Sequence, residues 1–456
     1  MKKVDFSDGR IAKDIFMTSL PILAAQILNL LYSIVDRMYI GRIPDIGTAA
    51  LGAVGLCFPV IVIITAFTNM YGMGGSPLFA MALGEGRDKR AGELQNTAFR
   101  LIVVTSLAAL VLCEFFGGRI LLIFGATADE LPMCLSYLRI YVLGTFFSMM
   151  TTGMNPYINA QGYAFNGMIS VTIGAVANLV LDPLFIFAFG LGIRGAAIAT
   201  VISQLLACTY VLYFLFRSGE NEFVLTFKLE FPHAREIIVL GMSAFVMQIT
   251  NSLVTIVCNN VLMRYGGSLY VSVMTIISSV RSMIDTPTLA IAYGASPVIS
   301  YNYGAKKPRN VRKAATIMTI MVLSYNFTIW LLIFNFPGAF VRIFSSSEEI
   351  MEDASAALHL YFLAFVFQAF QSAGQGVFKS LGKKGYSIFF SVFRKVILVV
   401  PLTILLPGVF GLGTYGVFAA EPVSNVIGGL ACFITMLITV PPELKKMRIE
   451  TEKAGQ

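Results

Sequence analysis

Long apolar runs alternate along the chain with short polar segments. Each run has about the twenty residues that a helix needs to cross the hydrocarbon core of a membrane. A membrane β-strand needs only about ten. The pattern therefore predicts an all-α polytopic membrane protein. It indicates twelve transmembrane helices, at residues 13–40, 50–80, 95–115, 134–156, 165–188, 195–216, 236–262, 269–300, 314–335, 354–378, 387–407 and 415–440.

Composition supports this class and excludes several others. The chain is 57% hydrophobic and 13% charged, with a mean hydropathy of +0.77. A soluble protein needs far more polar surface. The six cysteines lie in or beside apolar runs without a CxxC or metal spacing, so we expect core residues and no cofactor. The lysine-bearing start leads into a full-length span without a small-residue cleavage site, so no cleavable signal is expected.

The basic residues are unevenly distributed between the predicted loops. The segments that we assign to the cytoplasm hold 22 of the 33 lysines and arginines, in clusters such as 87–90 and 306–309. Because cytoplasmic loops are enriched in these residues, both termini are predicted to lie in the cytoplasm of a cell-membrane protein. The net charge of +8 is thus a topology signal, and no nucleic-acid partner is expected.

The second half of the chain repeats the first at an offset of about 220 residues. The segment 190–200, GLGIRGAAIAT, corresponds to 411–421, GLGTYGVFAAE. An even number of spans in each repeat gives both halves the same orientation, with an expected cleft between two bundles. The repeat predicts two pseudo-symmetric six-helix lobes, at residues 1–216 and 236–442, with a cytoplasmic linker at 217–235 and a cytoplasmic tail at 443–456.

A polar stripe crosses the first predicted span. Gln26, Asn29, Tyr32 and Asp36 are separated by three, three and four residues, which places them on one face of a helix. A carboxylate in this setting is costly unless it meets a cation, a proton or a partner. Asp36 is therefore a functional candidate, although an ion pair with a nearby arginine at the outer interface would also account for it.

Further polar residues are expected at the same depth. The 1.5 Å rise of a helix places Asp36, Asp182 and Thr200 in the outer half of the first lobe. Asn178 lies one turn from Asp182 on the same face. Two carboxylates, an amide and a hydroxyl could bind Na⁺ or share a proton. Asp182 could also cap the helix after Pro183, and the neutral side chains could serve only as hydrogen bonds between helices.

The paired halves and three motifs resemble the MATE (multidrug and toxic compound extrusion) family, and in particular its bacterial DinF- and MepA-like branch. The motifs are 36–41, 178–183 and 195–200. The resemblance implies a V-shaped pair of six-helix lobes and antiport of drugs, often cationic, against Na⁺ or H⁺. It also implies coupling positions at Asp36, Asn178, Asp182 and Thr200, and a substrate cavity lined by Asn29, Tyr32, Tyr137 and Asn155, to which we add Gln26 of the same stripe.

The second lobe also carries charged residues within its predicted spans. Arg281 and Asp285 are four residues apart and are expected to pair locally. His359 and Glu421 are kept with this pair as reserve coupling candidates. Some family members place their coupling acid in this lobe. Here the position equivalent to Asp36 is Cys258, so coupling is expected in the first lobe.

These features predict a monomeric secondary antiporter, surrounded by membrane lipid, that exports hydrophobic or cationic small-molecule drugs. A cation or proton entering from outside would neutralise the two acids, repack the first lobe and lower its hold on the drug. The alternative is a flippase of lipid-linked oligosaccharides or lipids from the same superfamily. An ATP-driven pump is not expected, because no GxxxxGK[ST] motif occurs. An enzyme is not expected, since His233 and His359 form no ligand cluster and no catalytic motif is present.

Overall fold

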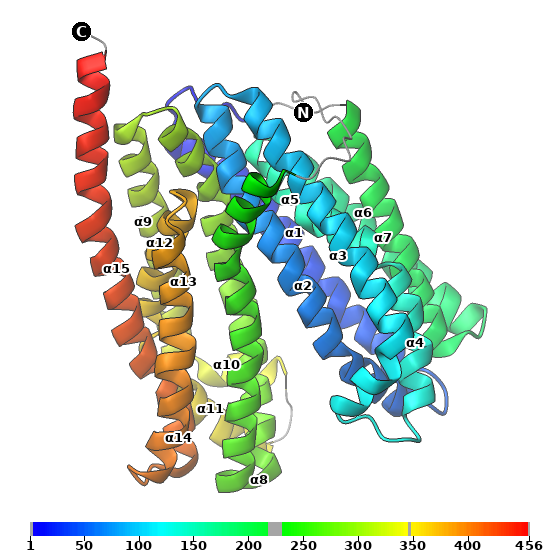
Figure 1. Cartoon of the computed structure of the whole chain (residues 1–456). Helices are drawn as coiled ribbons and strands as arrows, with labels where there is room; N and C mark the ends of the chain where they lie inside the picture. The colour runs from blue at the N-terminus through cyan, green and yellow to red at the C-terminus, as the bar shows by residue number, and fades with distance from the viewer. Residues whose placement is uncertain (1–2, 218–229, 345–347, 455–456) are drawn as a thin grey trace. The chain divides into compact units, whose positions relative to one another are not determined.

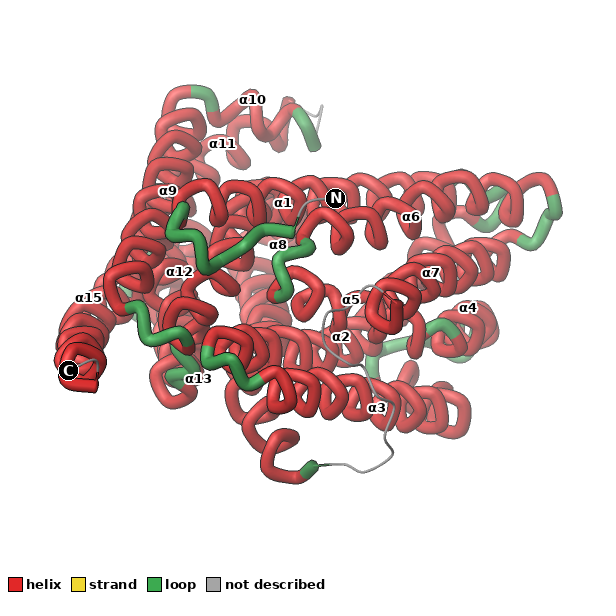
Figure 2. The backbone as a smooth tube through the Cα atoms, turned by 90° about the horizontal axis from the view of Figure 1, so that it is seen from above, coloured by secondary structure: helices red, strands yellow, loops and turns green. Residues whose placement is uncertain are grey.

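The structure is a computed structural model that describes residues 3–217, 230–344 and 348–454. Within these ranges every regular element is a helix and none is a strand (Figure 1, Figure 2). The elements are α1 (Ile11–Gly41), α2 (Gly47–Gly84), α3 (Asp88–Ile123), α4 (Leu131–Leu143), α5 (Thr145–Ala160), α6 (Ala164–Pro183), the π-helical turn η1 (Leu184–Ala188), α7 (Gly192–Arg217), α8 (Phe231–Gly304), α9 (Pro308–Asn335), α10 (Pro337–Arg342), α11 (Glu348–Phe362), α12 (Phe365–Ser380), α13 (Lys384–Val392), the π-helical turn η2 (Phe393–Val399), α14 (Val400–Gly408) and α15 (Gly413–Ala454).

Nine helical segments in the described ranges are long and apolar enough to cross a membrane, or eleven if each of two bent pairs is one span. The 74 residues of α8 contain two of the predicted spans. At about 110 Å, a straight helix of this length would exceed the membrane several times over. Gly267 interrupts it with a φ of 68° and a ψ of −165°. Each of the twelve predicted segments thus has a helical counterpart, and the all-helical membrane fold is confirmed.

The chain forms two compact units. Unit 1 consists of residues 1–5 and 21–245, and unit 2 consists of residues 6–20 and 246–456. The division falls within α1, at Pro21, and within α8, whereas the sequence analysis placed it in the 217–235 linker. Residues 218–229 of that linker lie outside the described residues. Two long helices therefore contribute residues to both units.

Unit 1 contains a crossing of α2 and the first turns of α8 at two glycines. A Cβ on Gly74 would lie 2.3 Å from the carbonyl oxygen of Ile237. A Cβ on Gly241 would lie 1.9 Å from the carbonyl oxygen of Met70. Glycines at this crossing allow two membrane helices to pack backbone against backbone.

We expect Gly241→Ala to destabilise the protein by about 1–3 kcal/mol, because the added methyl group forces the two backbones apart. The matched control is Gly52→Ala on α2, where a Cβ meets no atom within 4 Å. There the change should stabilise slightly, because alanine has the higher helix propensity by about 1 kcal/mol. Thermal melting of both variants in detergent measures the difference. Equal melting temperatures would contradict the close packing.

The predicted span 134–156 is bent, and this changes the geometry near the site. α4 and α5 meet at an angle of 52°. Gly144 stands between them, and a Cβ there would lie 2.7 Å from Val201 and 2.8 Å from Gln204, both on α7. The close approach of α7 therefore requires a glycine at the bend. The predicted span 134–156 is therefore not one continuous helix, and two of the predicted cavity residues lie on its separate parts, Tyr137 on α4 and Asn155 on α5.

Candidate functional site

Two acidic side chains from different helices of unit 1 meet. Asp36 is on α1 and Asp182 is on α6, and their carboxyl groups lie within hydrogen-bonding range of each other. Asp182 is fully buried, and Asp36 is half-buried. Two ionised carboxylates repel, and neither has a proton to donate. This contact is therefore favourable only with a proton shared between the acids or with a cation bound to them.

Two oxygens of this acid pair have no donor. Asn178 donates its amide Nδ2–H to Asp182 Oδ1 at 3.0 Å. The second oxygen of Asp182, Oδ2, and the Oδ1 of Asp36 are buried without a hydrogen-bond partner. A buried acceptor without a partner is costly. Hard cations prefer oxygen ligands. The oxygen atoms of the two carboxylates therefore suit Na⁺ as well as a proton.

Thr200 is placed on α7, which packs along α6. Its hydroxyl donates to the carbonyl oxygen of Ala196, one turn earlier, at 2.9 Å. The structure thus brings Asp36, Asn178 and Asp182 together and leaves the Thr200 proton committed to its own helix. The hydroxyl oxygen keeps free lone pairs, which are all that a cation ligand requires.

Local sequence explains why α7 begins close to the end of α6. Pro183 lacks an N–H group and cannot continue the ordinary helical ladder. The chain then forms the wider turn η1 over Leu184–Ala188. Gly195, near the start of α7, packs against this turn, because a Cβ there would lie 2.6 Å from the carbonyl oxygen of Phe185. The small residues after Gly195 therefore let α7 run close to the end of α6.

Three tyrosines lie near Asp36. Tyr32 of α1 interacts electrostatically with Asp36 and Asp182. Tyr137 and Tyr141 of α4 interact in the same way with Asp36. The rings of Tyr137 and Tyr141 are stacked, with centroids 5.9 Å apart. Of the predicted cavity residues, Tyr32 and Tyr137 thus lie around the carboxylates, although they belong to different helices.

The other predicted cavity residues have different environments. Asn155 joins α5 to α6, because its Nδ2 donates to Ser170 Oγ at 3.0 Å and to the Gly167 carbonyl at 3.3 Å. Its Oδ1 is buried without a partner. On α1, Gln26 is half-buried and Asn29 is exposed. Asn155 therefore joins α5 to α6 through two hydrogen bonds.

Sequence reasoning missed one polar residue near the acids. The Gln204 side chain of α7 lies near the Tyr141 hydroxyl, and its Oε1 is buried without a hydrogen-bond partner. It stands one turn after Thr200, and this four-residue spacing was the available signal. Tyr141 also borders a cavity of about 30 Å³, the volume of about one water molecule and far below that of a drug-sized pocket. The cavity is lined by Ile64, Thr65, Thr68, Tyr141, Thr145, Ser148 and Thr152.

Unit 2 repeats the geometry without the acids. At the repeat offset, Cys258 takes the place of Asp36 and Thr403 takes the place of Asp182. Their side chains still meet, with Cys258 Sγ 3.9 Å from Thr403 Oγ1. A thiol and a hydroxyl carry no charge to exchange, so the acid pair is confined to unit 1.

Glu421, at the position equivalent to Thr200, is the centre of a buried charge cluster in unit 2. It is 3% exposed. Its Oε1 lies 2.9 Å from Arg394 Nη1 and 3.6 Å from Lys395 Nζ, and it also pairs with Arg281 Nη1. Three cations thus share one carboxylate.

The predicted ion pair between Arg281 and Asp285 is confirmed, and it belongs to this cluster. Arg281 Nε lies 3.2 Å from Asp285 Oδ2. Arg281 also donates to Tyr361 Oη at 2.6 Å and to Gln368 Oε1 at 3.0 Å. The acids of the cluster are therefore committed to ion pairs across several helices. His359 has another partner, because its Nε2 lies 2.8 Å from the carbonyl oxygen of Phe334.

The chain is similar in sequence to one known protein family and to named relatives. The model of the MatE family matches residues 21–184 and 243–405. The multidrug export protein MepA of Staphylococcus aureus (strain MSSA476) is 25% identical over 416 residues, which cover 89% of this chain and 90% of MepA. MepA of Staphylococcus saprophyticus is 24% identical over 445 residues, 95% of each chain.

Solved structures show the same fold. A crystal structure of MATE in complex with MaD3S has a TM-score of 0.91 at 22% identity, covering 98% of this chain and 99% of that one. The outward-facing conformation of a multidrug resistance MATE family transporter of the MOP superfamily also has a TM-score of 0.91, at 23% identity with the same coverage. At these identities, the likeness concerns the fold alone.

Proposed function

The chain belongs to the MatE family, and from this premise we propose that it is a secondary active multidrug exporter. It moves hydrophobic, often cationic compounds out of the cell in exchange for Na⁺ or H⁺. The names of the relatives support this proposal, since MepA is a multidrug export protein in both staphylococci. As a multi-pass protein of the cell membrane, it has both termini in the cytoplasm, in keeping with the distribution of its basic residues.

One observation carries the coupling part of the proposal. Asp36 and Asp182 approach within hydrogen-bonding range while one oxygen of each is buried without a donor. A proton or Na⁺ arriving from outside neutralises the pair. Unit 1 then repacks around the neutralised acids and its hold on the drug weakens. When the cation leaves, the repulsion between the carboxylates returns and drives unit 1 back.

The surroundings of the acid pair suit the proposed substrates. Tyr32 and Tyr137 lie within electrostatic range of Asp36, and Asn178 orients Asp182. Aromatic rings beside a negative group attract a hydrophobic cation through area burial, cation–π contact and charge. Gln26, Asn29 and Asn155 complete the substrate cavity in this proposal, with Thr200 as a fourth oxygen ligand of the coupling ion.

The test is dye export by the purified protein in sealed vesicles with imposed Na⁺ or proton gradients. Export should follow one of the two gradients, and collapsing that gradient alone should stop it. Collapsing the other gradient should change nothing, because only one cation occupies the acid pair productively. Export that persists after both gradients are collapsed would contradict antiport. Movement of lipid-linked sugars without dye export would favour a flippase.

A further inference from the structure

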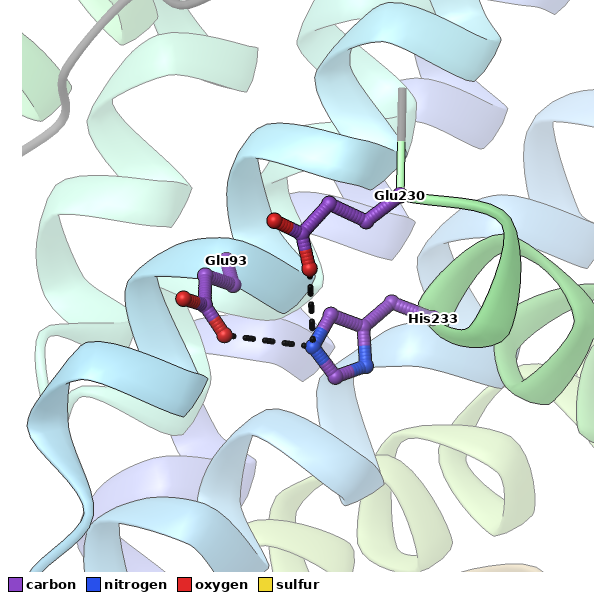
Figure 3. Close-up of side chains that lie close together, drawn as sticks. All are labelled: Glu93, Glu230 and His233. Atoms are coloured by element: carbon purple, nitrogen blue, oxygen red, sulfur yellow. Dashed lines mark hydrogen bonds and ion pairs between the residues drawn. The ribbon is translucent and has the colours of Figure 1, made fainter. Parts of the chain in front are cut away.

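A histidine in unit 1 lies between carboxylates near the first turns of α3 and α8. Glu93 is on α3, Glu230 precedes α8, and His233 is in the first turn of α8. The His233 Nε2 atom lies 3.2 Å from Glu93 Oε2 and 3.5 Å from Glu230 Oε2. Figure 3 shows both carboxylates directed at this same ring nitrogen. The ligand atoms of the three residues all lie within 4.8 Å of one another.

This cluster corrects the sequence analysis, which found no ligand cluster around either histidine. Glu230 and His233 are three residues apart and share one turn. Glu93 is 140 residues away along the chain and reaches His233 only through the packing of α3 against the start of α8. Sequence spacing alone therefore revealed two of the three groups, and two groups do not indicate a metal site.

Two of the three separations between the ligand atoms match those around a tetrahedral metal ion. Zinc binds imidazole nitrogen and carboxylate oxygen at about 2.0–2.2 Å, so neighbouring ligand atoms in a tetrahedron lie about 3.4 Å apart. The separations of His233 Nε2 from the two carboxylate oxygens are 3.2 and 3.5 Å, and the two carboxylate oxygens lie within 4.8 Å of each other. Two carboxylates also balance the charge of a divalent cation. A single N–H group, by contrast, cannot donate fully to two carboxylates at once.

The second ring nitrogen has no hydrogen-bond partner and faces a carboxylate. His233 Nδ1 is buried without a hydrogen-bond partner, and the whole side chain is 15% exposed. Glu236 Oε2 faces this nitrogen at 4.0 Å. Arg90 in turn pairs with Glu236 at 3.2 Å. At 4.0 Å Glu236 makes no hydrogen bond to Nδ1, and closing this gap would give the ring the carboxylate partner that a metal-bound histidine uses.

We propose that Glu93, Glu230 and His233 bind a divalent transition-metal ion, for which Zn²⁺ is the best match. An imidazole ligand disfavours Mg²⁺ and Ca²⁺, which take oxygen ligands, and favours zinc and its neighbours. Three protein ligands leave a fourth position for water. The bound ion joins α3 to the first turn of α8 and so stabilises unit 1. This site lies outside the acid pair of Asp36 and Asp182, and the proposal does not depend on the transported substrate.

The experiment uses the full-length protein in detergent, purified with a tag that contains no histidine, treated with chelator and titrated with Zn²⁺ by calorimetry. We expect one saturable site per chain. Glu93→Gln, which keeps the side chain's size, should weaken binding at least about 100-fold, since even outer-shell partners contribute 10–100-fold. His233→Gln should weaken zinc binding to a similar extent. His359→Gln, the change at the only other histidine, should leave the affinity unaltered.

X-ray absorption at the zinc edge identifies the ligands independently of activity. We expect one imidazole nitrogen with oxygen ligands and no sulfur, which separates this site from the six cysteines. Zinc should also raise the melting temperature of the wild type but not that of Glu93→Gln. Absence of saturable binding by the wild type would overturn the proposal, and the cluster would then be only a set of contacts between His233 and the two glutamates. Unchanged affinity in Glu93→Gln, or sulfur ligation, would overturn it as well.

Discussion

Asp36→Asn should reduce gradient-driven dye export to the level of protein-free vesicles. Asparagine has nearly the shape of aspartate and can donate a hydrogen bond to Asp182, so the variant should insert and fold. It cannot take up a proton or bind a cation with a full negative charge. Only Asp182 would remain ionisable, so the repulsion between two carboxylates could no longer form and exchange would stop. Reconstituted vesicles with an imposed gradient measure this directly.

The control for this prediction is another aspartate just beyond α1. Asp45 has a φ of 64°, a conformation that asparagine tolerates as readily as aspartate. Asp45→Asn should export dye like the wild type. Asp182→Asn should fail like Asp36→Asn, because either change removes one acid of the pair. Undiminished, gradient-dependent export by Asp36→Asn would remove Asp36 from the mechanism.

The largest expected effect on stability is at Glu421. Its carboxylate is 3% exposed and pairs with Arg281, Arg394 and Lys395. Glu421→Gln should destabilise the protein by about 3–5 kcal/mol, because it leaves buried cations without a counter-charge. Thermal melting and unfolding in denaturing detergent should both show this loss.

Two comparisons separate this effect from loss of an ordinary ion pair. Glu450 lies 3.9 Å from Lys446 in an exposed pair. Glu450→Gln should therefore cost less than about 1 kcal/mol. Lys395→Met should cost less than Glu421→Gln, because the cluster holds more cations than anions. If Glu421→Gln melts at the wild-type temperature, the cluster does not stabilise unit 2.

The sequence was sufficient for the membrane fold because apolar runs of about twenty residues are typical of helices that cross a bilayer. The positions of the two acids along their helices were also predictable. The rise per residue placed Asp36 and Asp182 at one level, and the structure brings their carboxyl groups together. The local pair of Arg281 and Asp285 followed from its four-residue spacing.

Features that depend on tertiary packing were not predictable. The bend at Gly144 arises because α7 approaches that glycine, and a hydropathy pattern does not indicate which helix will be the neighbour. The convergence of Arg281, Arg394 and Lys395 on Glu421 joins residues from distant parts of the sequence. The division into units at Pro21 and within α8 also reflects which contacts each part of a long helix makes.

The central claim is that one exchangeable cation resides between Asp36 and Asp182. Its most direct test is the release of that cation when substrate binds, measured with purified protein as protons in weak buffer and as radioactive Na⁺. The wild type should release one of the two ions on saturation with dye, and Asp36→Asn and Asp182→Asn should release neither. Equal release from wild type and both variants would contradict the account.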